Sequence, residues 1–141
     1  MRRILPVLVV LSVLLAFSAC QGLNSISDKD AAGTPTVYAK VLKEPNPLLM
    51  GHWRRIPPAE FNHPWIFDYI LVKKGDRYAF YYFYDSRNNA QHGYFSGWSD
   101  CTIDGDSMTS GADGSIFFVK DGEVYMQYPG HPKPTHMQRA E

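Results

Sequence analysis

Short apolar runs, separated by turn residues, fill the middle of the chain. The clearest pair covers residues 66–72 and 77–84, which are joined by Lys74-Gly75-Asp76 and predict a β-hairpin. In the second run, aromatic side chains fall on both faces of the pleat. This pattern indicates a central strand that is covered on both sides.

A second hairpin is predicted for residues 115–120 and 123–128. The link between them is Asp121-Gly122, and Asp-Gly between alternating segments is a strong signal for a tight turn. Further short runs, with no amphipathic helix between residues 48 and 128, predict an all-β fold. We expect a small antiparallel meander that closes as a barrel or a sandwich.

The composition changes on both sides of this region. Residues 20–47 hold few large apolar side chains and are expected to form a flexible, disordered linker. Within them, residues 37–42 alternate and could form a first strand or a short helix. The β domain is expected at residues 48–128. Residues 129–141 form a Pro-rich tail that we expect to stay outside the sheet.

Residues 1–19 have the layout of a secretory signal peptide. A positive start, Met1-Arg2-Arg3, precedes an apolar run over residues 4–17 and then the small residues Ser18 and Ala19. The run is shorter than the roughly 20 residues that cross a bilayer. We therefore expect export and removal of this segment.

The end of this signal, Leu-Ala-Phe-Ser-Ala-Cys at residues 15–20, resembles the lipobox of bacterial lipoprotein precursors. The resemblance implies cleavage before Cys20, a diacylglyceryl thioether on its sulfur and acylation of the new amino group. Phe17 departs from the pattern, because Leu, Val or Ile is more usual there. Ala16-Phe17-Ser18 also fits ordinary signal peptidase, which would release a soluble protein that starts at Ala19.

The resemblance also implies a location. Gln21 follows the cysteine and resembles the class of lipoproteins that is sorted to the outer membrane. Two or more acyl chains hold a protein firmly on a bilayer. We therefore expect an envelope protein, lipid-anchored at Cys20 and facing the periplasm from the outer membrane.

Charge excludes one class of partner. The chain of 141 residues has 14 basic and 14 acidic side chains, and removal of Arg2 and Arg3 leaves 12 basic against 14 acidic. Binding to nucleic acid needs a basic patch, and the sequence offers none. We expect no nucleic acid among its partners.

The sequence contains no recognisable motif for catalysis, metal binding or cofactor binding, and we expect no enzymatic activity, metal or cofactor. If Cys20 carries lipid, Cys101 has no partner within the chain, which leaves a buried thiol, an intermolecular disulfide or a reactive site. We favour a buried, inert thiol, since a catalytic one needs a base such as His92 nearby. Asp104, Asp106 and Asp113 do not match a calcium loop and are interpreted as solvated turn residues.

Gly51-His52-Trp53 opens the first clear strand of the domain. This Gly-x-Trp resembles the lipocalin signature, in which the Trp closes the floor of the barrel. The resemblance implies a carrier of a small apolar ligand as one alternative function. Trp53 is expected in the core in either case.

The most unusual loop covers residues 54–65 and combines prolines, arginines and aromatics. Arg54, Arg55, Phe61 and Trp65 are the candidate partner-binding residues, since Arg and Trp are common at protein interfaces. A connecting loop in which Phe61 and Trp65 cap the core remains an alternative. We expect a non-enzymatic lipoprotein that binds another protein in an immunity, inhibitor or accessory role.

Overall fold

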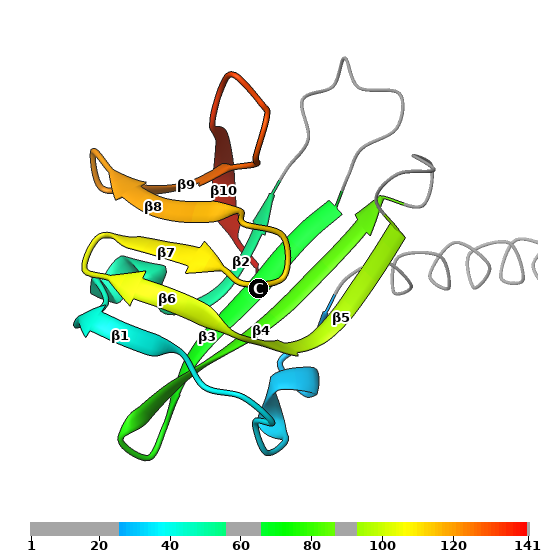
Figure 1. Ribbon diagram of the computed structural model, residues 1–141, viewed down its shortest axis with the longest axis vertical. Helices are drawn as coiled ribbons and strands as arrows, with labels where there is room; N and C mark the ends of the chain where they lie inside the picture. Colours follow the sequence, from blue (N-terminus) through cyan, green and yellow to red (C-terminus); the bar gives the residue numbers. More distant parts are fainter. Residues whose placement is uncertain (1–25, 56–65, 87–92, 141) are drawn as a thin grey trace, which may run out of the picture.

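The structure is a computed structural model that describes residues 26–55, 66–86 and 93–140. Within these residues the chain forms ten β-strands and two short 3₁₀ helices, so the predicted all-β class is confirmed (Figure 1). The elements, in chain order, are η1 (Asp30–Ala32), β1 (Lys40–Lys43), η2 (Pro47–Leu49), β2 (Gly51–Arg55), β3 (Ile66–Lys74), β4 (Arg77–Ser86), β5 (Gly93–Ser99), β6 (Cys101–Asp104), β7 (Ser107–Ser110), β8 (Ile116–Lys120), β9 (Glu123–Gln127) and β10 (Thr135–Arg139).

The strands form one curled sheet, a half-barrel, in the order β1-β6-β7-β8-β9-β10-β2-β3-β4-β5. From β2 to β10 the pairing is antiparallel, as the predicted meander requires, and β10 joins the start of the meander by pairing with β2. β1 is the exception, because it pairs in parallel with β6. In Figure 1, strands β6–β9 lie across strands β2–β5, and the core lies between these two halves.

Both predicted hairpins are present. β3 and β4 pair from Ile66 opposite Asp85 to Lys74 opposite Arg77, around a turn in which Gly75 has a positive φ. β8 and β9 are joined by Asp121 and Gly122, whose φ angles are 53° and 78°. Two positive φ angles are typical of the type I′ turn, whose twist matches that of the flanking strands.

Aromatic side chains fill the space between the two halves. Tyr69, Phe80, Tyr82 and Phe117 are fully buried, and their ring centroids lie 4.7–6.0 Å apart in neighbouring pairs. Pairs at such distances contribute about 0.5–1.5 kcal/mol beyond the area they bury. The hydroxyl of Tyr69 donates a hydrogen bond to the carbonyl of Leu49 at 3.0 Å, so its polar end is satisfied inside the core.

Trp53 lies in this core, as expected from the sequence. Its indole N–H donates to the carbonyl of Met50 at 3.2 Å. The guanidinium of Arg139, on β10, lies 4.5 Å from the centroid of the Trp53 ring and also donates to the Met50 carbonyl. The first and last strands of the meander are therefore joined by side chains as well as by backbone pairing.

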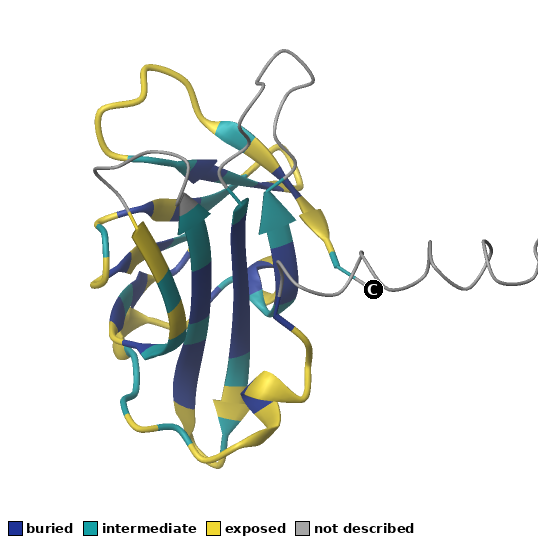
Figure 2. Ribbon diagram, turned by 90° about the vertical axis from the view of Figure 1, so that its right-hand side faces the viewer, coloured by how far each residue is buried: buried dark blue, intermediate teal, exposed yellow. Residues whose placement is uncertain are grey.

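A smaller apolar cluster covers the outer face of β3 and β4. Ile70 and Phe83 pack there against Ile26 and Ala31, which precede β1. As a result, β3 and β4 are buried along most of their length in Figure 2. The expectation that β4 is covered on both sides is confirmed.

The boundaries of the domain differ from those predicted. Residues 26–47 were expected in a flexible linker, in which residues 37–42 could form a first strand or a short helix. Ile26 and Ala31 are buried, and the strand β1 pairs with β6. The physical reason is that a few apolar residues suffice when a preformed sheet face receives them. Residues 20–25 of the predicted linker lie outside the described residues.

The predicted C-terminal tail also needs correction. Prolines exclude residues 129–134 from the sheet, but β10 begins directly after Pro134 and pairs with both β9 and β2. Met137, at the centre of β10, is buried in the core. The domain therefore extends to the end of the described chain.

Within the described residues, no helix has the length and apolar character needed to cross a membrane.

Candidate functional site

Three of the residues singled out from the sequence, Cys20, Phe61 and Trp65, lie outside the described residues. The loop that contains Phe61 and Trp65 leaves the sheet after Arg55 and returns at Ile66. It therefore connects the end of β2 to the start of β3, which lie side by side at one end of the half-barrel.

The side chains of Arg54 and Arg55 lie on opposite faces of the sheet. Successive side chains of a strand point to opposite faces of the sheet, so the two arginines of β2 diverge. Arg54 forms an ion pair with Asp68 on the outer face, with 2.9 Å between Nη2 and Oδ2. Arg55 lies over the ring of Phe67 on the inner face, 5.6 Å from its centroid. Of the two arginines, Arg55 lies on the inner face beside the aromatic core, and Arg54 is engaged by Asp68 on the outer face.

The outer-face ion pair is part of a charged cluster. Asp68 is fully buried and accepts hydrogen bonds from Nε and Nη2 of Arg54, while Nε2 of His52 lies 3.2 Å from Oδ2 of Asp68. The other ring nitrogen of His52 lies 3.6 Å from the carboxylate of Asp28. Pairing with Asp68 raises the pKa of Arg54. This cluster joins the segment before β1 to the sheet, which is a structural role.

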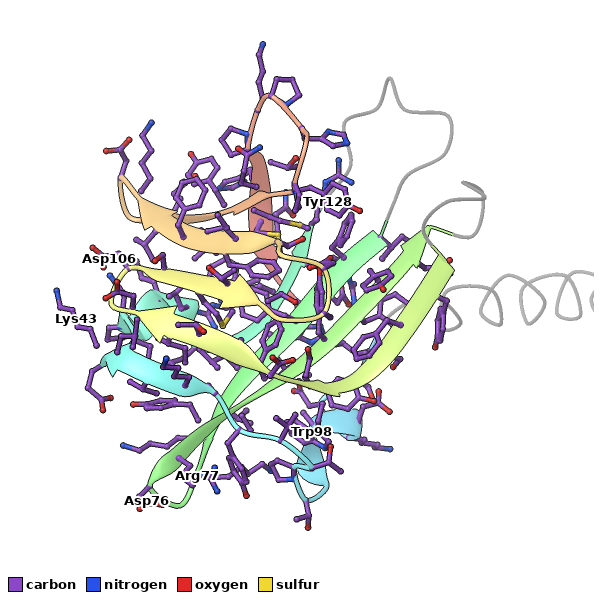
Figure 3. The ribbon with its side chains drawn as sticks, in the orientation of Figure 1. Lys43, Asp76, Arg77, Trp98, Asp106 and Tyr128 are labelled. Carbon is purple, nitrogen blue, oxygen red and sulfur yellow. The ribbon has the colours of Figure 1, made fainter. Side chains whose placement is uncertain are left out.

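Aromatic residues gather at the end of the half-barrel where β2 ends and β3 begins: Tyr84, Phe95 and Tyr128 are partly exposed, and Phe67 beside them is buried. We call Arg55, Phe67, Tyr84, Phe95 and Tyr128 the rim. Phe67 lies 6.3 Å from Tyr84 and 5.6 Å from Tyr128, and Tyr84 stacks on Phe95 at 5.8 Å with 19° between the planes. Figure 3 shows Tyr128 at this end, near the ends of β2 and β3, while Asp76 and Arg77 mark the opposite end.

Asp113, in the link between β7 and β8, binds Tyr82, whose ring lies next to Tyr84 of the rim. Its carboxylate accepts hydrogen bonds from the hydroxyl of Tyr82 at 2.7 Å and from the backbone N–H of Ser115 at 2.9 Å. Burial, and secondly the charge of Asp113, raise the pKa values of Tyr82, Tyr84 and Tyr128. The three hydroxyls therefore stay protonated to a more alkaline pH than a free tyrosine does. Asp113 lies in a turn and is partly exposed, as interpreted from the sequence, but its carboxylate is also bound by the hydroxyl of Tyr82.

A small hollow of about 10 Å³ lies beside the rim, between the end of β2 and the link from β9 to β10. This is roughly the space of one water molecule. Its apolar wall consists of Phe67, Met126 and Tyr128. The remaining lining residues are Arg55, His131, Lys133 and Thr135.

Cys101 is buried and forms no disulfide, as predicted. Burial, and secondly the nearby charge of Asp100, raise the pKa of its thiol to about 12. The thiolate is the nucleophilic form of cysteine, so this thiol is poorly suited to catalysis. His92, the base considered from the sequence, lies outside the described residues.

We expect Cys101 to react slowly with iodoacetamide in the folded protein. A thiol pKa of about 12 instead of 9.0 lowers the thiolate fraction at neutral pH about 1,000-fold, before steric protection is counted. Mass spectrometry of the labelled protein, with a urea-unfolded sample as the control, measures this difference. Comparable rates in the two samples would contradict a buried thiol.

The remaining candidates from the sequence were metal ligands and the acidic residues Asp104 and Asp106. Among residues 26–55, 66–86 and 93–140, no three His, Cys, Asp or Glu side chains lie close enough together to hold a metal ion. Asp104 and Asp106 are exposed, and Asp106 accepts a hydrogen bond from Asn46 at 2.8 Å. These two residues act as turn residues, as interpreted from the sequence.

Some of these residues could have been found from the sequence, and others could not. Asp68 is the one acidic residue in the apolar run 66–72, and this position could have identified a buried ion pair. Asp113, Tyr84 and Tyr128 belong to three separate segments, so no local pattern connects them.

Comparison with known proteins gives no relative, because no family model, curated protein or solved structure matches the chain.

Proposed function

We propose that the chain is a lipid-anchored envelope lipoprotein whose half-barrel binds another protein through the rim. The observation that carries this proposal is the cluster of partly exposed aromatic rings beside Arg55, at the end of a barrel whose interior is filled. The partner would be a protein of the envelope, in an immunity, inhibitor or accessory relationship.

The composition of the rim favours a protein partner. Tyr and Arg are among the residues that contribute most to protein interfaces, since they combine a large contact area with hydrogen-bonding groups. Tyr84 and Tyr128 are partly exposed, and their neighbours hold their rings in place. Rings that are already fixed lose little conformational entropy on binding.

A filled interior argues against the carrier alternative. The side chains between the two halves, among them Tyr69, Phe80 and Phe117, are fully buried and contact one another. An apolar ligand would have to displace these rings, at a cost of several kcal/mol for each large side chain removed from the core.

Site-specific photocrosslinking tests the proposed surface. A benzophenone amino acid in place of Tyr84 is expected to form a discrete protein adduct in cells of the native host, because Tyr84 lies within the proposed interface. Tyr38 is the matched control, since Arg77 lies 3.7 Å from its ring centroid in an arrangement similar to that of Arg55 and Phe67. Adducts at Tyr38 but not at Tyr84 would contradict the proposal.

The same surface predicts a loss of affinity. Tyr84→Ala is expected to weaken capture of the crosslinked partner about tenfold or more, the usual effect of removing an interface hot spot. Tyr38→Ala should leave capture unchanged, and thermal melting curves should show that both variants are folded. Equal capture by both variants would rule out the rim.

A further inference from the structure

The half-barrel is an open sheet with two edges, which are formed by β1 and β5. Figure 1 shows β5 along the right-hand side of the molecule. Within the part of the chain that the structure describes, β4 is the only strand that pairs with β5. The other side of an edge strand presents backbone donors and acceptors that can pair with a strand of another chain.

The edge formed by β1 is protected against pairing with a copy of itself. Proteins limit such pairing with short edge strands and with lysine side chains. β1 has four residues, and lysine stands at both ends. Antiparallel pairing of two β1 strands would place Lys40 opposite Lys43, and like charges in directly opposite positions are destabilising.

The edge formed by β5 has neither of these protections. β5 is seven residues long and contains no charged residue and no proline. Its outer face is accessible, since Tyr94 is 55% exposed and Ser96 is also exposed. The ring of Tyr94 contacts Phe83 edge-on at 5.5 Å, so this exposed ring is supported by β4.

The sequence of β5 is complementary to itself. When two copies of Gly93–Ser99 pair antiparallel over their full length, Ser96 lies opposite Ser96 of the second copy. Tyr94 then lies opposite Trp98, and aromatic pairs in this arrangement stabilise a sheet. Phe95 lies opposite Gly97, where an aromatic ring can cover the glycine backbone. No charged side chain enters the contact.

This register would join aromatic residues on both faces of the sheet. On the outer face Trp98 lies opposite Tyr81, with ring centroids 5.1 Å apart, and Figure 3 shows Trp98 on the side of β5 that points away from the core. On the inner face Phe95 stacks on Tyr84. A second β5 strand would extend both rows.

We infer that two copies of the chain pair through their β5 strands, antiparallel and centred on Ser96, so that the two sheets become one. A twofold contact of this kind needs a surface that is complementary to itself, which β5 provides and β1 does not. The inference goes beyond the proposed function and does not rest on it, since the edge of β5 carries it rather than the rim.

Native mass spectrometry of the full chain, extracted from membranes in mild detergent with a reducing agent present, tests this inference. We expect twice the mass of the chain for the wild type. Ser96→Lys should weaken the dimer about tenfold or more, because it places two lysines opposite each other. Thr109→Lys is the matched control and should keep the dimer, since Thr109 is exposed on β7, which is paired on both sides.

Mixing two variants tests the register. Ser96→Lys and Ser96→Glu should each be mostly single chains when measured alone. Together they should form a mixed dimer, because opposite charges then face each other across the axis. Ser96 is exposed, so both variants should fold, and thermal melting curves check this.

The outcomes are distinct from those that concern the rim. A wild-type protein of single-chain mass at every concentration would overturn the inference, and so would a dimer that persists in Ser96→Lys or a mixture that forms no mixed dimer. A second copy adds the mass of one chain, which distinguishes it from a different protein bound at the rim. Loss of such a protein in Tyr84→Ala bears on the proposed function alone.

Discussion

Replacing Arg54 by alanine is expected to destabilise the domain by about 3 kcal/mol. The variant leaves the fully buried carboxylate of Asp68 without its main partner, and breaking a buried ion pair in this way costs about 3–5 kcal/mol. We take the lower end because the side chain of Arg54 is itself 37% exposed. A small domain has only about 5–15 kcal/mol of stability in total.

Urea unfolding of the variants measures this effect, and Arg77→Ala is the control. Arg77 is an exposed arginine on β4, and its contact with the ring of Tyr38 contributes about 1 kcal/mol or less. In a third variant, Arg54 and Asp68 are both replaced by leucine, and it should recover most of the loss because no buried charge remains. Equal losses for Arg54→Ala and Arg77→Ala would contradict the assigned role of Asp68.

The proposed lipid anchor predicts that replacing Cys20 by serine abolishes lipidation completely. The thioether needs the sulfur of Cys20, and no other residue of the motif can replace it. Incorporation of radioactive palmitate into the wild-type protein, and its loss in Cys20→Ser, would measure this effect. Cys101→Ser, which removes the other cysteine of the chain, is the control and should retain full incorporation.

The intact mass of the protein recovered from cells distinguishes the two cleavage sites. The anchor predicts a chain that begins at Cys20 and carries the mass of a diacylglyceryl group and an acyl chain. An unmodified chain that begins at Ala19 would show that ordinary signal peptidase acts instead. This result would refute the lipid anchor, and it would not affect the proposal that the rim binds a protein partner.

An anchored domain would stand close to the bilayer. Five residues lie between Cys20 and Ile26, which is buried against β3 and β4, and the six residue steps from one to the other span at most about 20 Å. The proposed partner would therefore be reached near the membrane surface.

Local sequence patterns were sufficient to predict the hairpins. The turn at Asp121-Gly122 and the alternation around it are encoded within a dozen residues, and both appear in the structure as expected. The strand at residues 37–42 was left as one of two alternatives, and the packing of residues 26–31 and the strand β10 were missed, for the opposite reason. Their partners lie far away in sequence, for example β6 for β1 and β2 for β10.

The candidate site was predictable only in part. The sequence identified both Arg54 and Arg55, and strand alternation could have separated them once β2 was assigned. The other rim residues come from β3, β4, β5 and the end of β9, and only the curl of the sheet brings them together. A single sequence has no local signal for such long-range contacts.

The central claim is that the rim binds a protein while the filled half-barrel carries no ligand. Native mass spectrometry of the protein, isolated gently from the envelope of its own host, tests this claim most directly. We predict an added mass of protein size on the wild type, lost in Tyr84→Ala and retained in Tyr38→Ala. An added mass of small-molecule size, unchanged by Tyr84→Ala, would contradict the account and favour a carrier.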